Sequence, residues 1–101
     1  GQPTALKDLI SYEKGSIANV DLVHADNMKF VLMAFDAGTS LPPHRAPGNA
    51  ILTALEGKAI IDYEGQDYEL NAGESFRFDK NGLHSVTADG RFKMGLLLVL
   101  E

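Results

Sequence analysis

The sequence contains no cysteine and no tryptophan, and its acidic side chains outnumber its basic ones. The absence of cysteine excludes disulfides, thiolate metal sites and a cysteine nucleophile. The nine Lys and Arg residues are scattered, and the net charge is −5. Binding to nucleic acid or to an anionic membrane surface needs clustered positive charge. We therefore expect neither nucleic acid nor a membrane as a partner.

Long apolar runs are also missing. The longest stretch, residues 94–100, has seven residues, whereas a membrane-spanning helix needs roughly 20. A run of this length is typical of a strand that is buried on both faces. The first four residues, Gly1 to Thr4, show no positively charged segment followed by an apolar one, as a secretory signal would. Together with the lack of cysteine, this favours a cytoplasmic location.

Familiar catalytic motifs are absent as well. The sequence has no G-x-G-x-x-G, no G-x-x-x-x-G-K and no H-E-x-x-H segment, so dinucleotide, P-loop and zinc-protease sites have no support. Ser75 lacks the second glycine of a nucleophile elbow, and we expect it to be structural. The carboxylates fall mainly at predicted turns, where solvation is their expected role, and they reveal no catalytic pair. These residues are Asp36, Glu56, Glu64, Asp67, Glu74, Asp79 and Asp89.

The 101 residues suffice for one domain with one core. Turn signals recur about every eight to ten residues with short strands between them, which predicts an all-β sandwich or barrel. Turns at Glu56-Gly57 and at Asp89-Gly90 are expected to separate successive strands. The expected strands cover residues 17–23, 28–35, 50–55, 58–63, 67–70, 75–78, 84–88 and 91–100.

The N-terminal residues 1–16 are expected to form an extension ahead of a barrel domain at residues 17–101. Residues 4–10 favour one or two helical turns, with Thr4 as the cap. Leu6, Leu9 and Ile10 would then share one helical face. In the barrel, the strands at 28–35 and 91–100 are apolar on both faces. This is more apolar surface than one barrel interior can bury. We therefore predict a homodimer formed through an outer sheet face.

Two of the three histidines lie in comparable settings, each in a β segment that follows a turn. His84 alternates with polar residues in register with Val86 and Ala88, so it is expected to point inward. If His44 points inward, Ala46 does too. Two inward imidazoles on rigid strands can bind a divalent metal or act as acid and base. His24 borders the turn at residues 26–27, so a surface position is expected, although it could serve as a third nitrogen ligand.

The spacing of glycines and histidines resembles the two motifs of the cupin superfamily over about residues 17–100. Gly38, His44 and Gly57 match the first motif, and Gly73 and His84 match the second. The resemblance is to a small, single-domain cupin of the conserved-barrel, RmlC-like type. It implies an all-β double-stranded β-helix, a jelly-roll barrel of about eight to ten strands, with a short N-terminal extension.

The sequence departs from the family pattern where the metal ligands would stand. In metal-binding cupins the first motif supplies two histidines and a glutamate, and the second supplies one histidine. Here Ala46 replaces the second histidine and Ala50 replaces the glutamate. The resemblance therefore implies one divalent transition metal (Mn, Fe, Ni or Zn) held weakly by His44 and His84, or no metal. Asn49 could lend an amide oxygen.

The small side chains at these positions leave room for an organic ligand. The candidate pocket-lining residues are Met33, Ala46, Asn49, Ala50, Leu52 and Met94. The favoured function is binding of a small molecule, with no established catalysis. One alternative is a metal-dependent isomerase, decarboxylase or dioxygenase that uses His44 and His84. The other is a metal-free acid–base isomerase with one histidine as base. The sequence names no substrate and leaves the choice between enzyme and binding protein open.

Overall fold

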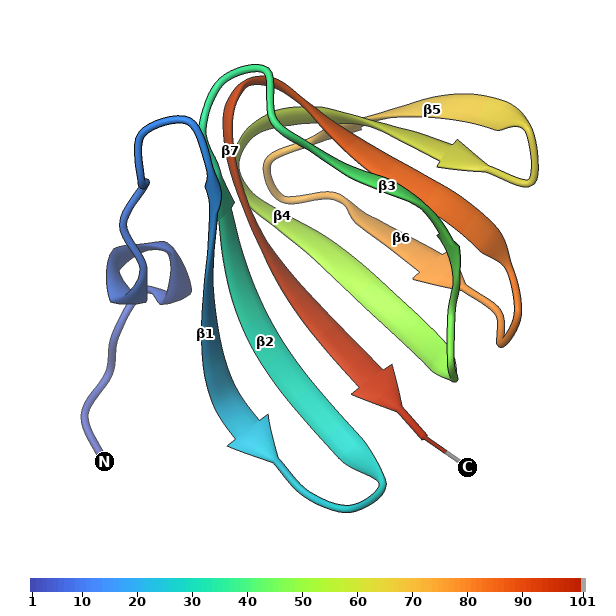
Figure 1. The fold of residues 1–101 in the computed structure, drawn as a ribbon. Helices are drawn as coiled ribbons and strands as arrows, with labels where there is room; N and C mark the ends of the chain where they lie inside the picture. The colour runs from blue at the N-terminus through green and yellow to red at the C-terminus, as the bar shows by residue number, and fades with distance from the viewer. Residues whose placement is uncertain (101) are drawn as a thin grey trace.

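The computed structural model describes residues 1–100 and confirms the predicted all-β jelly roll (Figure 1). One short 3-10 helix, η1, precedes seven strands that pair antiparallel in a single sheet of order β1-β2-β7-β4-β5, with β3 on β7 and β6 on β4. The elements are η1 (Leu6–Leu9), β1 (Ile17–His24), β2 (Met28–Phe35), β3 (Ser40–Arg45), β4 (Asn49–Tyr63), β5 (Gln66–Asn71), β6 (Ser75–Phe78) and β7 (Leu83–Val99).

The two longest strands, β4 and β7, fold this sheet into two layers. The first part of β4 pairs with β6 and with the end of β7, which also pairs with β2. The second part of β4 pairs with β5 and with the start of β7, which also pairs with β3. Both strands pass from one layer to the other, and the core lies between the layers (Figure 1).

The expected turns at Glu56-Gly57 and Asp89-Gly90 are wrong, and each joins two of the eight expected strands into one. Strand β3, which was not among those eight, brings the described chain to seven, where eight to ten were expected. Both sites are irregularities inside continuous strands, and Gly57 and Gly90 have φ angles of 77° and 80°. Glu56 pairs with Lys93 and Lys58 pairs with Asp89, so β4 and β7 bend together at one level. A bulge bends a strand without ending its pairing.

Strand β2 is apolar on both faces, as its sequence predicts. Val31, Met33 and Phe35 face the core between the layers. Leu32 and Ala34 face outward, where they form a second buried cluster with Ile10 from the N-terminal extension. The extension therefore covers part of the outer sheet face that the sequence left without a partner.

The helical prediction for the extension is correct in kind and wrong in detail. Helix η1 is preceded by Ala5 with no side-chain cap, so Thr4 is not the cap. Ile10 is already extended and is buried, whereas Leu9 is 41% exposed. Because the helix has only four residues and ends before Ile10, Leu9 and Ile10 do not share a helical face.

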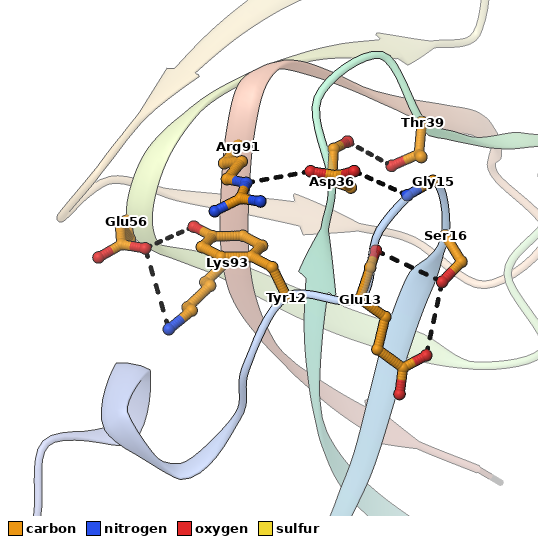
Figure 2. A network of polar contacts seen from close by, with 9 residues as sticks. All are labelled: Tyr12, Glu13, Gly15, Ser16, Asp36, Thr39, Glu56, Arg91 and Lys93. Atoms are coloured by element: carbon orange, nitrogen blue, oxygen red, sulfur yellow. Dashed lines mark hydrogen bonds and ion pairs between the residues drawn. The ribbon is translucent and has the colours of Figure 1, made fainter.

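A group of polar contacts holds the extension on the barrel (Figure 2). The Tyr12 hydroxyl donates to Glu56, and Lys93 Nζ donates to the carbonyl oxygen of Lys7 at 2.7 Å. The Arg91 guanidinium carbon and Lys93 Nζ each lie 4.9 Å from the centre of the Tyr12 ring, within cation–π range. Burial and the neighbouring Glu56 raise the pKa of Tyr12, so its hydroxyl remains a donor.

A second anchor lies at the end of the extension, next to the first (Figure 2). Asp36 accepts a hydrogen bond from the Gly15 amide at 2.7 Å and from Arg91 Nε at 3.0 Å. The hydrogen bond from the Gly15 amide, and to a lesser extent the one from Arg91, lower the pKa of the Asp36 carboxyl.

Within residues 1–100, no helix has the length and apolar character needed to cross a membrane.

Candidate ligand pocket

The register of β3 on β7 places His44 directly opposite His84. Their ring centroids are 4.3 Å apart and the rings are tilted by 57°. Strand β3 carries Pro42 and Pro43, which an edge position tolerates, and its pairing is irregular between Leu41 and His44. The two histidines, far apart in sequence, therefore meet as cross-strand neighbours.

Each imidazole is held by a carbonyl oxygen two residues earlier in the chain. His44 Nδ1 lies 3.0 Å from the Pro42 oxygen, and His84 Nδ1 lies 3.1 Å from the Gly82 oxygen. A carbonyl oxygen only accepts, so Nδ1 must donate and each neutral ring keeps its lone pair on Nε2. Across residues 1–100, no buried side-chain nitrogen or oxygen lacks a partner, so the unbonded Nε2 of His84 is open to adjoining space.

The two histidines differ in depth. His84 is 7% exposed and stacks on Phe78 with ring centroids 4.0 Å apart and planes 19° from parallel. It is buried in register with Val86 and Ala88, as the strand alternation predicts. Burial lowers the pKa of His84, and the nearby His44 adds to this effect. His84 is therefore a neutral acceptor near pH 7, while His44 is exposed.

A cavity of about 260 Å³ adjoins both rings at the end of the barrel where β3 and β6 end and β4 begins. Its remaining walls are apolar and come from Ala46, Pro47, Ala50, Phe78, Leu96 and Leu98. Ala46 and Ala50, at the two positions where the resemblance implies lost metal ligands, are both buried. The Arg45 side chain donates to the Asn81 carbonyl at 2.9 Å and is not part of the wall.

Four of the predicted lining residues lie elsewhere. Leu52, Met33 and Met94 are buried core residues, with Leu52 one inward position further along β4 than Ala50. Met33 and Met94 pair with each other across β2 and β7, deeper in the barrel. Asn49 points away from this cavity. Its Oδ1 accepts from the Lys80 amide at 2.9 Å, and the residue borders a separate hollow of about 140 Å³.

Sequence reasoning missed four wall residues, namely Pro47, Phe78, Leu96 and Leu98. Phe78 and Leu98 both pair with Ala50, on β6 and β7 respectively. Alternation alone places them on an inner face. Their approach to the histidines depends on strand register, which the sequence does not contain.

His44 and His84 have too few metal-ligating neighbours to form a complete metal site. Within the part of the chain that the structure describes, no three His, Cys, Asp or Glu side chains gather closely enough to hold an ion. His24 is a surface residue, as expected, with Nδ1 3.3 Å from Asp21 Oδ2. Two imidazoles are fewer than the three or four protein ligands usual at zinc or non-haem iron centres.

Comparison with known proteins places this architecture in a family. A family model described as the cupin domain matches residues 31–100. A cupin superfamily protein from Desulfitobacterium hafniense is similar in structure, with a TM-score of 0.95, 23% identity, and coverage of 99% of this chain and 92% of the other. A conserved protein of unknown function from Streptococcus pyogenes has a TM-score of 0.94, 23% identity, and coverage of 99% and 88%. Both likenesses concern the fold.

A cupin 2 conserved barrel domain protein from Leptotrichia buccalis is more similar in sequence, with 37% identity and a TM-score of 0.89. The match covers 93% of this chain and 46% of that protein, so this chain corresponds to less than half of it. The search of curated proteins finds no match.

Proposed function

The chain belongs to the cupin domain family, and we propose that it binds a small organic molecule in the cavity that His44 and His84 adjoin. The observation that carries this proposal is the cavity of about 260 Å³, where the two imidazoles are the only polar side chains that residues 1–100 contribute. Ligand sites are mostly apolar concavities with a few fixed polar groups. The cavity lies slightly below the roughly 300–1,000 Å³ typical of sites for drug-sized molecules. The ligand is therefore a compact one.

The two replaced ligand positions support binding over metal chemistry. Ala46 and Ala50 are 2% and 6% exposed and form part of the cavity wall. In metal-binding cupins the resemblance puts a histidine and a glutamate at these positions. Alanine removes the donor atoms and leaves volume in their place, which suits an organic ligand better than an ion.

The two enzymatic alternatives have weaker support. A metal-dependent isomerase, decarboxylase or dioxygenase would depend on His44 and His84 alone for its protein ligands. A metal-free acid–base isomerase needs an imidazole oriented by a carboxylate. In the described chain both Nδ1 atoms donate to backbone carbonyls instead. Elemental analysis of the purified protein and of His44→Ala separates the metal-dependent enzyme from the binding protein.

The test of the binding proposal is a fragment screen followed by two-dimensional NMR. Compact apolar fragments are expected to shift the resonances of His84, Ala50 and Leu98. Filling the cavity in Ala50→Leu is expected to abolish these shifts. Ile51→Leu alters the next residue of β4, which faces the outer hollow, and provides the matched control. Fragments that bind Ala50→Leu as well as they bind the native protein would contradict the proposal.

We also propose that two copies associate through the outer sheet face. A row of cross-strand neighbours, Val23, Phe30, Leu97 and Ile51, runs across β1, β2, β7 and β4 on this face. Val23 and Ile51 are 42% and 45% exposed in the single chain. A continuous apolar surface of this kind marks an interaction site. The cytoplasmic location stays a prediction from the sequence.

A further inference from the structure

We propose that the ligand of this pocket is a hydrogen-bond donor: a compact apolar body, such as a single ring, that donates one hydroxyl or N–H group to Nε2 of His84. This inference rests on the proposed function and specifies its ligand class. It excludes carboxylates and other anions as the preferred ligands of the neutral protein.

The polarity of the pocket follows from the way the imidazoles are held. Pro42 and Gly82 present carbonyl oxygens to the two Nδ1 atoms, at 3.0 and 3.1 Å. These bonds fix the hydrogen of each neutral ring on Nδ1, so that Nε2 can only accept. Among the described residues, no other side chain of the cavity wall has a polar atom. The side chains of the described wall therefore offer acceptors and no donor, and among them a carboxylate would meet lone pairs.

The position of His84 makes it the acceptor that selects the ligand. Its ring packs against the rings of Phe78 and His44, with centroid distances of 4.0 and 4.3 Å. A buried acceptor that loses its partner costs more than an exposed one, because water replaces the partner less easily. A ligand that fills the cavity without donating to His84 pays this cost. His44 is exposed and remains hydrated, so it distinguishes less strongly between ligands that donate a hydrogen bond and ligands that do not.

The apolar wall and the volume define the rest of the ligand. Leu96 and Leu98 are partly exposed toward the cavity, and Ala46 and Ala50 complete its floor. An apolar protein cavity of about 150 Å³ is large enough to bind benzene. The present cavity of about 260 Å³ therefore accepts one ring with small substituents.

The main rival is a cation supplied by Lys29. Lys29 pairs with the wall residue Leu98 and shares its sheet face, although it does not line the cavity. An ammonium group at the cavity mouth would favour a carboxylate over a neutral donor. The two arrangements predict opposite preferences, so one set of probes distinguishes them.

The experiment compares para-cresol, toluene and benzoate as probes, by two-dimensional NMR titration of the native protein at pH 8.5. At this pH imidazoles are neutral. Para-cresol is expected to bind about tenfold more tightly than toluene, the effect of one net hydrogen bond, and benzoate is expected to bind most weakly. Equal affinities for para-cresol and toluene, or a preference for benzoate, would overturn the inference and leave the proposed function standing. Failure of all three probes to bind would overturn both.

Two variants assign the effect to His84. His84→Phe keeps an aromatic ring on Phe78 and removes Nε2, so the preference for para-cresol over toluene is expected to disappear while toluene still binds. His24→Phe, an exchange on the exposed surface, is the matched control and should keep the preference. If His84→Phe does not fold, His84→Leu, which also has no acceptor at this position, replaces it, and its circular dichroism spectrum verifies folding. A preference that survives in the folded His84 variant would overturn the assignment.

Discussion

The imidazole of His84 lies almost flat on the ring of Phe78, with centroids 4.0 Å apart and planes 19° from parallel. This contact removes one face of the imidazole from water, while the Gly82 carbonyl fixes the hydrogen on Nδ1. The rest of the ring faces His44 and the cavity. Stacking on Phe78 and the hydrogen bond to Gly82 therefore orient Nε2 of His84 as a hydrogen-bond acceptor.

The same contact predicts acid sensitivity. The pKa of His84 is lowered from its ordinary value of 6.5, mainly by burial, so the unfolded chain binds more protons than the native state over this range. The contribution of neutral His84 to the free energy of unfolding is therefore fully present above pH 6.5. It decreases as the pH falls from 6.5 to the lowered pKa of His84 in the folded state. The titratable residues paired with His84 on the adjacent strands are His44 on β3 and Tyr63 on β4.

Urea denaturation at a series of pH values between 8 and 5 measures this loss. His84→Phe is expected to show a shallower fall than the native protein, because its buried site cannot take up a proton. Tyr68→Phe, which leaves all three histidines in place, serves as the control and should follow the native profile. An equal pH slope in His84→Phe and native protein would contradict the assignment to His84.

Filling the cavity should block the ligand in a protein that still folds. Ala50→Leu adds three carbons to a wall residue that is 6% exposed. We expect para-cresol affinity to fall at least tenfold and the free energy of unfolding to change by about 1–3 kcal/mol, the range for overpacking. NMR titration and urea denaturation measure the two quantities. Unchanged affinity would show that the probe binds elsewhere.

The tyrosine of the extension provides a test of how the extension is held. Tyr12→Phe keeps the ring that contacts Arg91 and Lys93 and removes the hydroxyl that donates to Glu56. The expected cost is about 1–3 kcal/mol in the free energy of unfolding, as for a hydrogen bond to a charged group. Amide exchange near Ile10 should accelerate. Tyr68→Phe, at a residue 39% exposed, is the control and should have little effect.

Gly57 and Gly90 form a matched pair for the bend in β4 and β7. Both have positive φ angles, 77° and 80°. A Cβ at Gly57 would overlap the Arg91 carbonyl oxygen, whereas a Cβ at Gly90 has no other atom within 4 Å. Gly90→Ala should therefore cost about 1–2 kcal/mol from the left-handed conformation alone, and Gly57→Ala clearly more. Equal losses in thermal or urea denaturation would contradict the close approach.

The outer sheet face predicts the oligomeric state. Ile51 is 45% exposed on this face and pairs with Leu97. Light scattering at micromolar concentration is expected to give the mass of a dimer for the native protein and of a monomer for Ile51→Lys, because burying a lysine there is costly. Tyr68→Lys, on strand β5, is the control and should remain dimeric. A monomeric native protein would reject the interface.

Local signals determined most of the strand pattern. The pairs of turn residues at 64–65 and 81–82 place turns where the structure has them, because glycine and asparagine tolerate positive φ. Alternation placed His84 with Val86 on the inner face, and the two apolar faces of residues 28–35 are both used. Each of these features depends on a residue and its near neighbours, so it can be predicted from the sequence.

Tertiary structure decided the features that depend on pairing between distant segments. Gly57 and Gly90 look like turn residues in the sequence, yet they lie in continuous strands because β4 and β7 bend together. The register of these strands places Leu98 and Phe78 beside Ala50 and keeps Met33 and Met94 deeper in the core. The N-terminal extension covers Leu32 and Ala34 through contacts far along the chain.

The two histidines show most directly which features the sequence determined and which depended on the tertiary structure. The sequence alone placed His44 and His84 in β segments, and its resemblance to cupins implied that alanine replaces two metal ligands of that family. It did not determine which nitrogen of each ring accepts a hydrogen bond. That property depends on the carbonyl oxygens of Pro42 and Gly82 and on the stacking of His84 against Phe78, which exist only once the strands are paired.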